Sequence, residues 1–201
     1  MTLTRSINTF IILLFGFSLV ACSPSVKRGK AEDQKELSGK WNANDSRLVS
    51  KKVVGSMLEG RWVRNHLKKH HKSPTIIVGK ITNLSHEIIN VATFIADIER
   101  EMINSGEIQF VASSDERGQI RNERTDQSIN SSRDTRKAPN KESGADYMLI
   151  GNLNSFVERL DGVQNFQYQI DLTLISMRDN KKVWVESQKH AKTVKRTLFG
   201  L

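Results

Sequence analysis

The chain has 201 residues, with 31 Lys and Arg against 22 Asp and Glu, a net charge of +9 and a single cysteine. This length suits one compact domain with short extensions, and one cysteine excludes an intramolecular disulfide framework. The basic residues are spread along the chain. We therefore expect most of them on solvated surfaces, with at most a supplementary attraction to anionic polymers, lipid head groups or an acidic protein patch.

The first 21 residues are typical of an export signal. Arg5 supplies a positive start, and an apolar run without charge follows from Phe10 to Val20. That run is shorter than the roughly 20 residues that a membrane-spanning helix needs. Residues 1–21 are therefore predicted to be a signal peptide. Export also argues against nucleic acid as a partner, although the basic charge alone would raise that possibility.

Cys22 follows the apolar run in the context Leu19-Val20-Ala21-Cys22, which resembles a bacterial lipoprotein box. The resemblance implies cleavage before Cys22 and lipid on the new N-terminus. The alternatives are a plain secretory signal or an uncleaved anchor. An aspartate after the cysteine would favour the inner membrane in the usual sorting scheme, so Ser23 favours the outer membrane, facing the periplasm.

Residues 22–37 are predicted to be a lipidated N-terminus and short flexible tether, because they are polar and contain Pro24 and Gly29. A tether of about 15 residues reaches at most about 50 Å when fully stretched. The globular domain is expected to occupy residues 38–201.

The globular part opens with a predicted helix that Asn44 or Asp45 caps and that runs to about Glu59. Gly60 interrupts it, and a further turn or two is expected over residues 62–70, before Pro74. The apolar face of the first helix is expected to contain Leu48, Val49, Val53, Met57 and Leu58.

The middle of the chain alternates strands and helices. Residues 75–81 are β-branched and apolar, which predicts a strand buried on both faces. Residues 85–90 lead into a helix that ends near Asn104 with Gly106 as its stop. A short strand over 108–112 and a charged helix over 115–130, capped by Ser114, are expected next, followed by a polar loop over 131–143.

The last third is strand-like. A strand over 146–157 is followed by the turn signal Asp161-Gly162 and by strict apolar–polar alternation from Phe166 to Leu174. A second turn over 178–180 precedes a strand with Trp184 on the face opposite Val183 and Val185. The fold class is therefore α/β (α+β mixed), with a single mixed β-sheet of about five strands and flanking helices. The first strands are expected to be parallel and the last three antiparallel.

Catalytic patterns are weak. The chain has no Gly-rich phosphate loop, and nothing in it places two carboxylates in a cleft. His66 and His70 are four residues apart beside His71, which is zinc-ligand spacing, but no carboxylate in that segment completes the set. A solvated, cationic helix end is the favoured interpretation. We expect no catalytic residue, no metal and no cofactor.

Three residues are candidates for partner binding: Trp41, Arg47 and Trp62. Tryptophan and arginine dominate the hot spots of protein interfaces. The alternative, which we favour for Trp41, is a side chain that covers the edge of the core and fixes the first helix.

The segment from Ser38 to Leu48 resembles the S-G-x-W-N-x-x-D-S-R-L signature of LpoB-type lipoproteins, the outer-membrane activators of bifunctional penicillin-binding proteins. The resemblance continues in order through Ile77–Ile81, Thr93–Ile95, Asp97–Arg100, Ile103–Gly106, Phe110–Ala112, Gly144–Gly151, Tyr168–Gln169 and Val183–Trp184.

This resemblance implies a globular domain similar to the N-terminal domain of TolB and a binding function without catalysis. The lipoprotein would dock on the regulatory domain of a bifunctional peptidoglycan synthase and stimulate glycan polymerisation and, with it, cross-linking. The tether of this chain is shorter than the long Pro-rich tether of the enterobacterial members. An envelope-assembly or secretion-pore lipoprotein of related fold is the alternative, but the long membrane-spanning hairpins that a pore needs are not evident. An enzyme or metal protein is the third hypothesis.

Overall fold

The computed structural model describes residues 38–137 and 141–195. The predicted signal peptide, Cys22 and the tether lie outside the described residues. The described residues form one five-stranded sheet with the strand order β2-β1-β3-β4-β5. Its strands are β1 (Thr75–Asn83), β2 (Gln109–Phe110), β3 (Tyr147–Leu160), β4 (Val163–Ser176) and β5 (Lys182–Lys195).

The sheet is mixed as predicted. β1 is parallel to both β2 and β3, whereas β3, β4 and β5 form an antiparallel meander. The predicted turn at Asp161-Gly162 joins β3 to β4, with positive φ angles of 45° and 77° at these residues. Such angles match a type I′ hairpin turn, which the twist of paired strands favours. The predicted fold class is confirmed.

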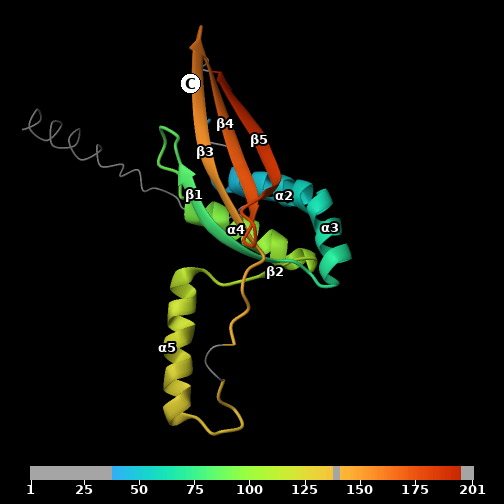
Figure 1. The fold of residues 1–201 in the computed structure, drawn as a ribbon. Helices are drawn as coiled ribbons and strands as arrows, with labels where there is room; N and C mark the ends of the chain where they lie inside the picture. The colour runs from blue at the N-terminus through green and yellow to red at the C-terminus, as the bar shows by residue number, and fades with distance from the viewer. Residues whose placement is uncertain (1–37, 138–140, 196–201) are drawn as a thin grey trace, which may run out of the picture. The chain divides into compact units, whose positions relative to one another are not determined.

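The helices are α2 (Ala43–Glu59), α3 (Arg61–His70), α4 (Val91–Ser105) and α5 (Ser114–Asn130). α2 and α4 lie side by side against one face of the sheet (Figure 1). α5 buries none of its residues. The charged arm formed by α5 therefore adds no side chain to the core.

The prediction that the first strand, β1, is buried on both faces is wrong, because the described helices cover only one face of the sheet. In β1, Ile76 and Ile81 are buried, while Ile77 and Gly79 are half-buried and Lys80 is exposed. The β-branched composition predicted the strand correctly but not its environment, because no helix layer formed by residues 38–137 and 141–195 covers the second face of the sheet.

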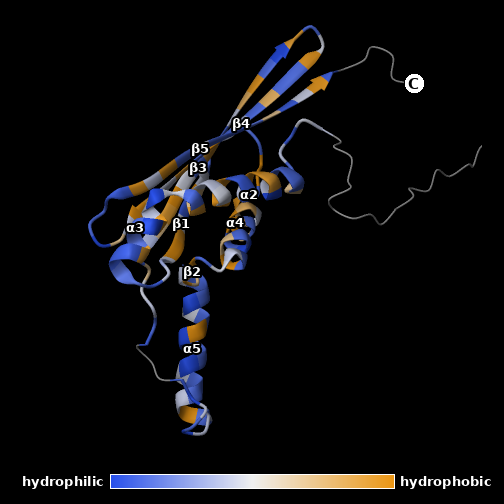
Figure 2. Cartoon of the chain, turned by 90° about the vertical axis from the view of Figure 1, so that its right-hand side faces the viewer, coloured by the Kyte–Doolittle hydropathy of each residue, from blue (hydrophilic) through white to orange (hydrophobic). Residues whose placement is uncertain are grey.

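The core lies between the sheet and the two packed helices. Apolar and polar residues alternate in colour along the long strands (Figure 2), and on β4 the predicted alternating residues are all buried. The buried side chains of β4 are Phe166, Tyr168, Ile170, Leu172 and Leu174. Burying one large apolar side chain stabilises the folded state by about 1.5–3 kcal/mol. Because β4 buries five such side chains, it makes a large contribution to the core.

The helix caps differ by one to three residues from the predictions. Asn42, rather than Asn44 or Asp45, caps α2, and Asp45 completes a capping box with it. Ser113, rather than Ser114, caps α5. Leu48 was expected on the apolar face of α2 but is 38% exposed. Gly106, with φ 70°, ends α4 in the left-handed conformation as predicted.

Candidate binding surface

The segment that precedes α2 is held on the sheet by Tyr168. The single proton of the Tyr168 hydroxyl lies between two acceptors, Glu87 Oε1 at 2.9 Å and the Gly39 carbonyl at 3.1 Å. The Trp41 backbone N–H donates to the other oxygen of Glu87 (3.2 Å). A Cβ atom on Gly39 would lie 2.2 Å from the Phe166 ring, so a larger residue there would force the ring or the backbone to shift. The start of the signature segment is therefore built around close contact with β4.

The Trp41 ring packs against the edge of the core. It makes edge contacts with the rings of Tyr168, Phe94 and His190, at centroid distances of 5.2, 6.1 and 6.2 Å. This packing agrees with the structural alternative that we favoured for Trp41. The ring is only half-buried, and its contact with a partner stays a prediction.

Asp45 forms the centre of a buried ionic cluster. Its side chain is 0% exposed and accepts from Lys192 Nζ (2.6 Å) and from the backbone N–H of Asn42 (2.8 Å). His190 Nε2 lies 2.9 Å from its second oxygen. Burial alone would raise the pKa of Asp45, but the hydrogen bonds from His190, Lys192 and Asn42 outweigh it and lower the pKa below its usual value. Asp45 is thus held as a carboxylate that joins α2 to β5.

The neighbouring residue, Ser46, joins α2 to α4. Its hydroxyl donates to Asp97 Oδ2 at 2.6 Å, and the other oxygen of Asp97 is 2.7 Å from Arg100. Arg47 is half-buried and donates to the Asn44 side chain at 2.9 Å, within its own helix. Most residues of the signature segment therefore have a structural role, because they join this segment to the sheet or to α4. These residues are Gly39, Trp41, Asn42, Asp45 and Ser46. Arg47 instead bonds only within its own helix.

Trp62 lies at the start of α3, after α2 has ended. Its side chain is 4% exposed, its indole N–H donates to the Met57 carbonyl (2.9 Å), and its ring contacts Tyr147 edge-on at 5.1 Å. Because α2 has 17 residues, it is about 25 Å long and separates Trp41 from Trp62. The structure does not bring the two tryptophans together, and Trp62 fixes α3 against the sheet.

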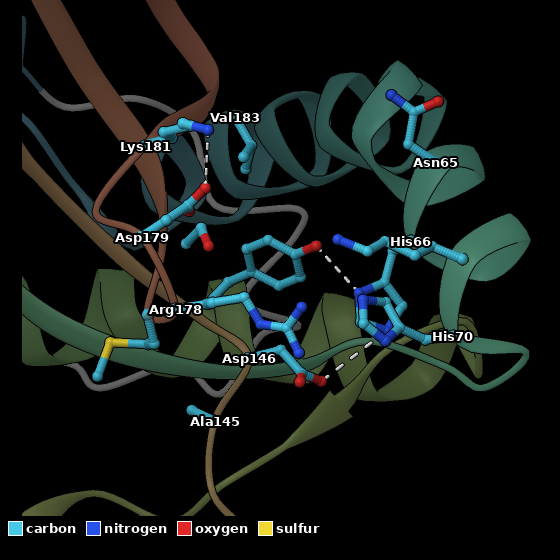
Figure 3. Close-up of a pocket in the computed structure, with 13 residues that line it drawn as sticks. Asn65, His66, His70, Ala145, Asp146, Arg178, Asp179, Lys181 and Val183 are labelled. Atoms are coloured by element: carbon cyan, nitrogen blue, oxygen red, sulfur yellow. Dashed lines mark hydrogen bonds and ion pairs between the residues drawn. The ribbon is translucent and has the colours of Figure 1, made fainter.

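A hollow of about 400 Å³ lies between α3, the start of β3 and the β4–β5 turn (Figure 3). We call it the α3 hollow. Its lining includes His66, Lys69, His70, Asp146, Tyr147, Met177, Arg178, Asp179, Lys181 and Val183.

The environment of His66 differs from the predicted solvated helix end. Its side chain is 3% exposed, with Nδ1 3.0 Å from the Tyr147 hydroxyl and Nε2 3.9 Å from Asp146 Oδ2. Burial lowers the pKa of His66, and the nearby carboxylate of Asp146 opposes that shift. Tyr147 and Asp146 lie some 80 residues away in the chain, so the local spacing of histidines could not predict that they contact His66.

His66 and His70 do share one face, with ring centroids 4.6 Å apart. Within the described ranges, no group of three His, Cys, Asp or Glu side chains is arranged to hold a metal ion. The absence of a bound metal stays a prediction for the protein itself.

The outer side of α3 is basic. Arg61, Arg64, Lys68 and Lys69 are exposed, and the helix contains no acidic residue. Trp62, Val63 and His66 face inward, so the cations gather on the solvent side.

Comparison with known families decides the assignment. The model of the peptidoglycan-synthase activator LpoB matches residues 45–190. The chain belongs to the LpoB family. The matched segment begins at Asp45 and ends at His190, the two residues whose side chains meet in the buried ionic cluster.

Several solved structures are similar in fold. The C-terminal domain of LpoB from Salmonella enterica is 13% identical, with a TM-score of 0.39, over 76% of this chain and 99% of that chain. The LpoB C-terminal domain from Escherichia coli is 14% identical, with a TM-score of 0.42, over 73% and 98%. Lipoprotein GNA1162 from Neisseria meningitidis is 11% identical, with a TM-score of 0.41, over 62% and 86%. No curated protein sequence matches the chain.

No helix within the described ranges has the length and apolar character needed to span a bilayer.

The first prediction concerns the buried ionic cluster. Asp45→Ala should lower the free energy of unfolding by about 3–5 kcal/mol, because it leaves Lys192 and His190 without the carboxylate that they share. Urea denaturation monitored by tryptophan fluorescence measures this loss. Asp179→Ala, which removes a carboxylate paired with Lys181 at the surface, is the matched control. Equal, small effects of both substitutions would contradict the structural role of Asp45.

The second prediction concerns pH. The pKa of Asp45 is lowered by folding, so the unfolded state binds more protons over the interval between the two pKa values. The stabilisation is complete above the ordinary carboxyl pKa of about 4 and is lost as pH falls through the folded-state pKa. The unfolding free energy should therefore fall below about pH 4, and Asp45→Asn should flatten part of that decline. Denaturation curves recorded from pH 2 to pH 6 give the unfolding free energy at each pH. If that free energy declines equally steeply with falling pH in the wild type and in Asp45→Asn, the prediction is refuted.

Proposed function

We propose that this protein binds the regulatory domain of a bifunctional penicillin-binding protein and stimulates its glycan polymerisation and, with it, cross-linking. The observation that carries the proposal is the match of residues 45–190 to a family described as peptidoglycan-synthase activators. That match spans the folded domain from the first turn of α2 to β5, so it concerns the whole binding module rather than one motif.

An activator of this kind needs no chemistry of its own. It has only to bind the active conformation of the synthase better than the inactive one, because a ligand shifts an equilibrium by its differential affinity. A difference of about 1–3 kcal/mol would shift the equilibrium between the inactive and active conformations by about 5- to 150-fold.

The proposed contact lies at the N-terminal end of α2. Trp41 and Arg47 are half-buried near the start of this helix, and Leu48 is exposed there. Tryptophan and arginine are enriched in interface hot spots. Trp62 is too deeply buried to present its ring, and it would contribute by holding the basic surface of α3 in place.

Lipidation of Cys22 and attachment to the outer membrane, on its periplasmic side, are the second part of the proposal. The lipoprotein box and Ser23 support them. Residues 22–37 would then limit the reach of the domain to about 50 Å from the membrane, plus the size of the domain itself. The synthase must come within that distance.

The third prediction tests activation. Mature protein should raise the rate of lipid II polymerisation by the bifunctional synthase of the same organism, and Arg47→Glu should reduce the gain at least fivefold by placing a negative charge in the contact. Arg133→Glu, at an exposed loop position, is the charge-matched control. A wild-type protein that neither binds the synthase nor changes its rate would sink the proposal. Equal activation by Arg47→Glu would remove Arg47 from the contact.

The fourth prediction tests the anchor. Cys22→Ala should move the protein from the outer-membrane fraction to the soluble periplasmic fraction and abolish the mass increase expected from lipid. Fractionation and intact mass spectrometry measure both changes. Ser25→Ala, three residues further along, is the control and should leave both unchanged. A Cys22→Ala protein that stays in the membrane fraction would argue for an uncleaved anchor.

A further inference from the structure

We propose that the α3 hollow is a binding site for a carboxylate carried on a short chain, the chemistry of an acidic side chain or of a peptide C-terminus. The site is separate from the proposed contact at the start of α2, and the proposal does not depend on the synthase. It rests on three observations: an unpartnered buried nitrogen, two unpaired cations and a cavity of suitable size.

The first observation is the imidazole of His66. Its Nε2 is buried and has no hydrogen-bond partner among the described residues, which is uncommon in native proteins. A lone pair on Nε2 would face the Asp146 carboxylate 3.9 Å away, which is unfavourable. We therefore assign the proton to Nε2, with the Tyr147 hydroxyl donating to Nδ1. The hollow thus has a buried N–H donor without an acceptor at hydrogen-bond distance.

The second observation is the balance of charge. Asp179 is paired with Lys181 at 3.0 Å, and Asp146 accepts from the Thr75 backbone N–H at 3.0 Å and lies 4.0 Å from Lys72. Both carboxylates that line the hollow therefore already have partners.

Two cations of the lining remain. The side chains of Lys69, from α3, and Arg178, from the β4–β5 turn, make no ion pair or hydrogen bond to any described residue. Arg178 extends from its turn toward His66 and Asp146 (Figure 3). The hollow therefore has an excess of positive charge, which favours the binding of an anion.

The third observation is the size and lining of the hollow. Its volume of about 400 Å³ falls within the range of small-ligand sites. The ring of Tyr147 and the side chains of Met177 and Val183 line it beside the cations. A guanidinium binds the two oxygens of a carboxylate side by side, and the apolar walls suit the short chain that carries it.

The test uses three blocked amino acids as probes, followed by NMR of the full mature protein. N-acetylglutamate α-amide offers a side-chain carboxylate, N-acetylglutamine offers a C-terminal carboxylate, and N-acetylglutamine amide is the neutral isostere of both. At least one acid should shift the resonances of His66 and Tyr147 in a saturable manner, with an affinity at least about tenfold above that of the neutral amide. The stronger acid identifies the source of the carboxylate.

The variants Lys69→Ala and Arg178→Ala should each weaken binding at least about fivefold, as expected from loss of a charge-assisted contact. Lys68→Ala, an exposed neighbour outside the lining, should leave the affinity unchanged. Equal binding of the neutral amide, or equal weakening by all three variants, would overturn the proposal. Inorganic phosphate, added as a further arm, would overturn the assignment to carboxylates if it bound more tightly than either acid.

Discussion

The buried carboxylate of Asp45 is the constraint on which the rest of the domain depends. An isolated buried charge is strongly unfavourable, so Asp45 is tolerated only because Lys192, His190 and a backbone N–H meet it. Lys192 lies 147 residues further along the chain. The cluster therefore joins the first helix to the last strand, and the meander has to bring β5 back to α2. The boundaries of the family match coincide with this contact.

Among the described residues, the two packed helices cover one face of the sheet and leave the other without a helix layer (Figure 1). α2 and α4 pack on the side of the sheet that carries the alternating apolar residues of β4 (Figure 1). On the other face polar side chains interact across the strands, as Ser187 does with Asp171 at 2.6 Å. Such a domain has a well-packed core and broad exposed surfaces. That arrangement is compatible with the docking on a synthase that we propose.

α3 shows how one short helix serves both the core and the surface. Trp62 and His66 face inward, where they contact Tyr147, while Arg61, Arg64 and Lys68 face solvent. Because Trp62 anchors the helix, the position of His66 above the start of β3 is fixed. The α3 hollow and the basic outer side are thus two consequences of the same packing, and both lie apart from the signature segment at the other end of α2.

The sequence alone determined the elements, their order, the mixed sheet and the turn at Asp161-Gly162, because these depend on local periodicity and on residues that tolerate positive φ. It also contained the signature that identifies the family. The tertiary structure decided that β1 is covered on one face, that Leu48 points outward and that His66 is buried beside Tyr147. It also showed that Trp41 and Trp62 do not form one patch. Each of these depends on partners distant in the chain, and no local pattern encodes which distant residue will lie against a given side chain.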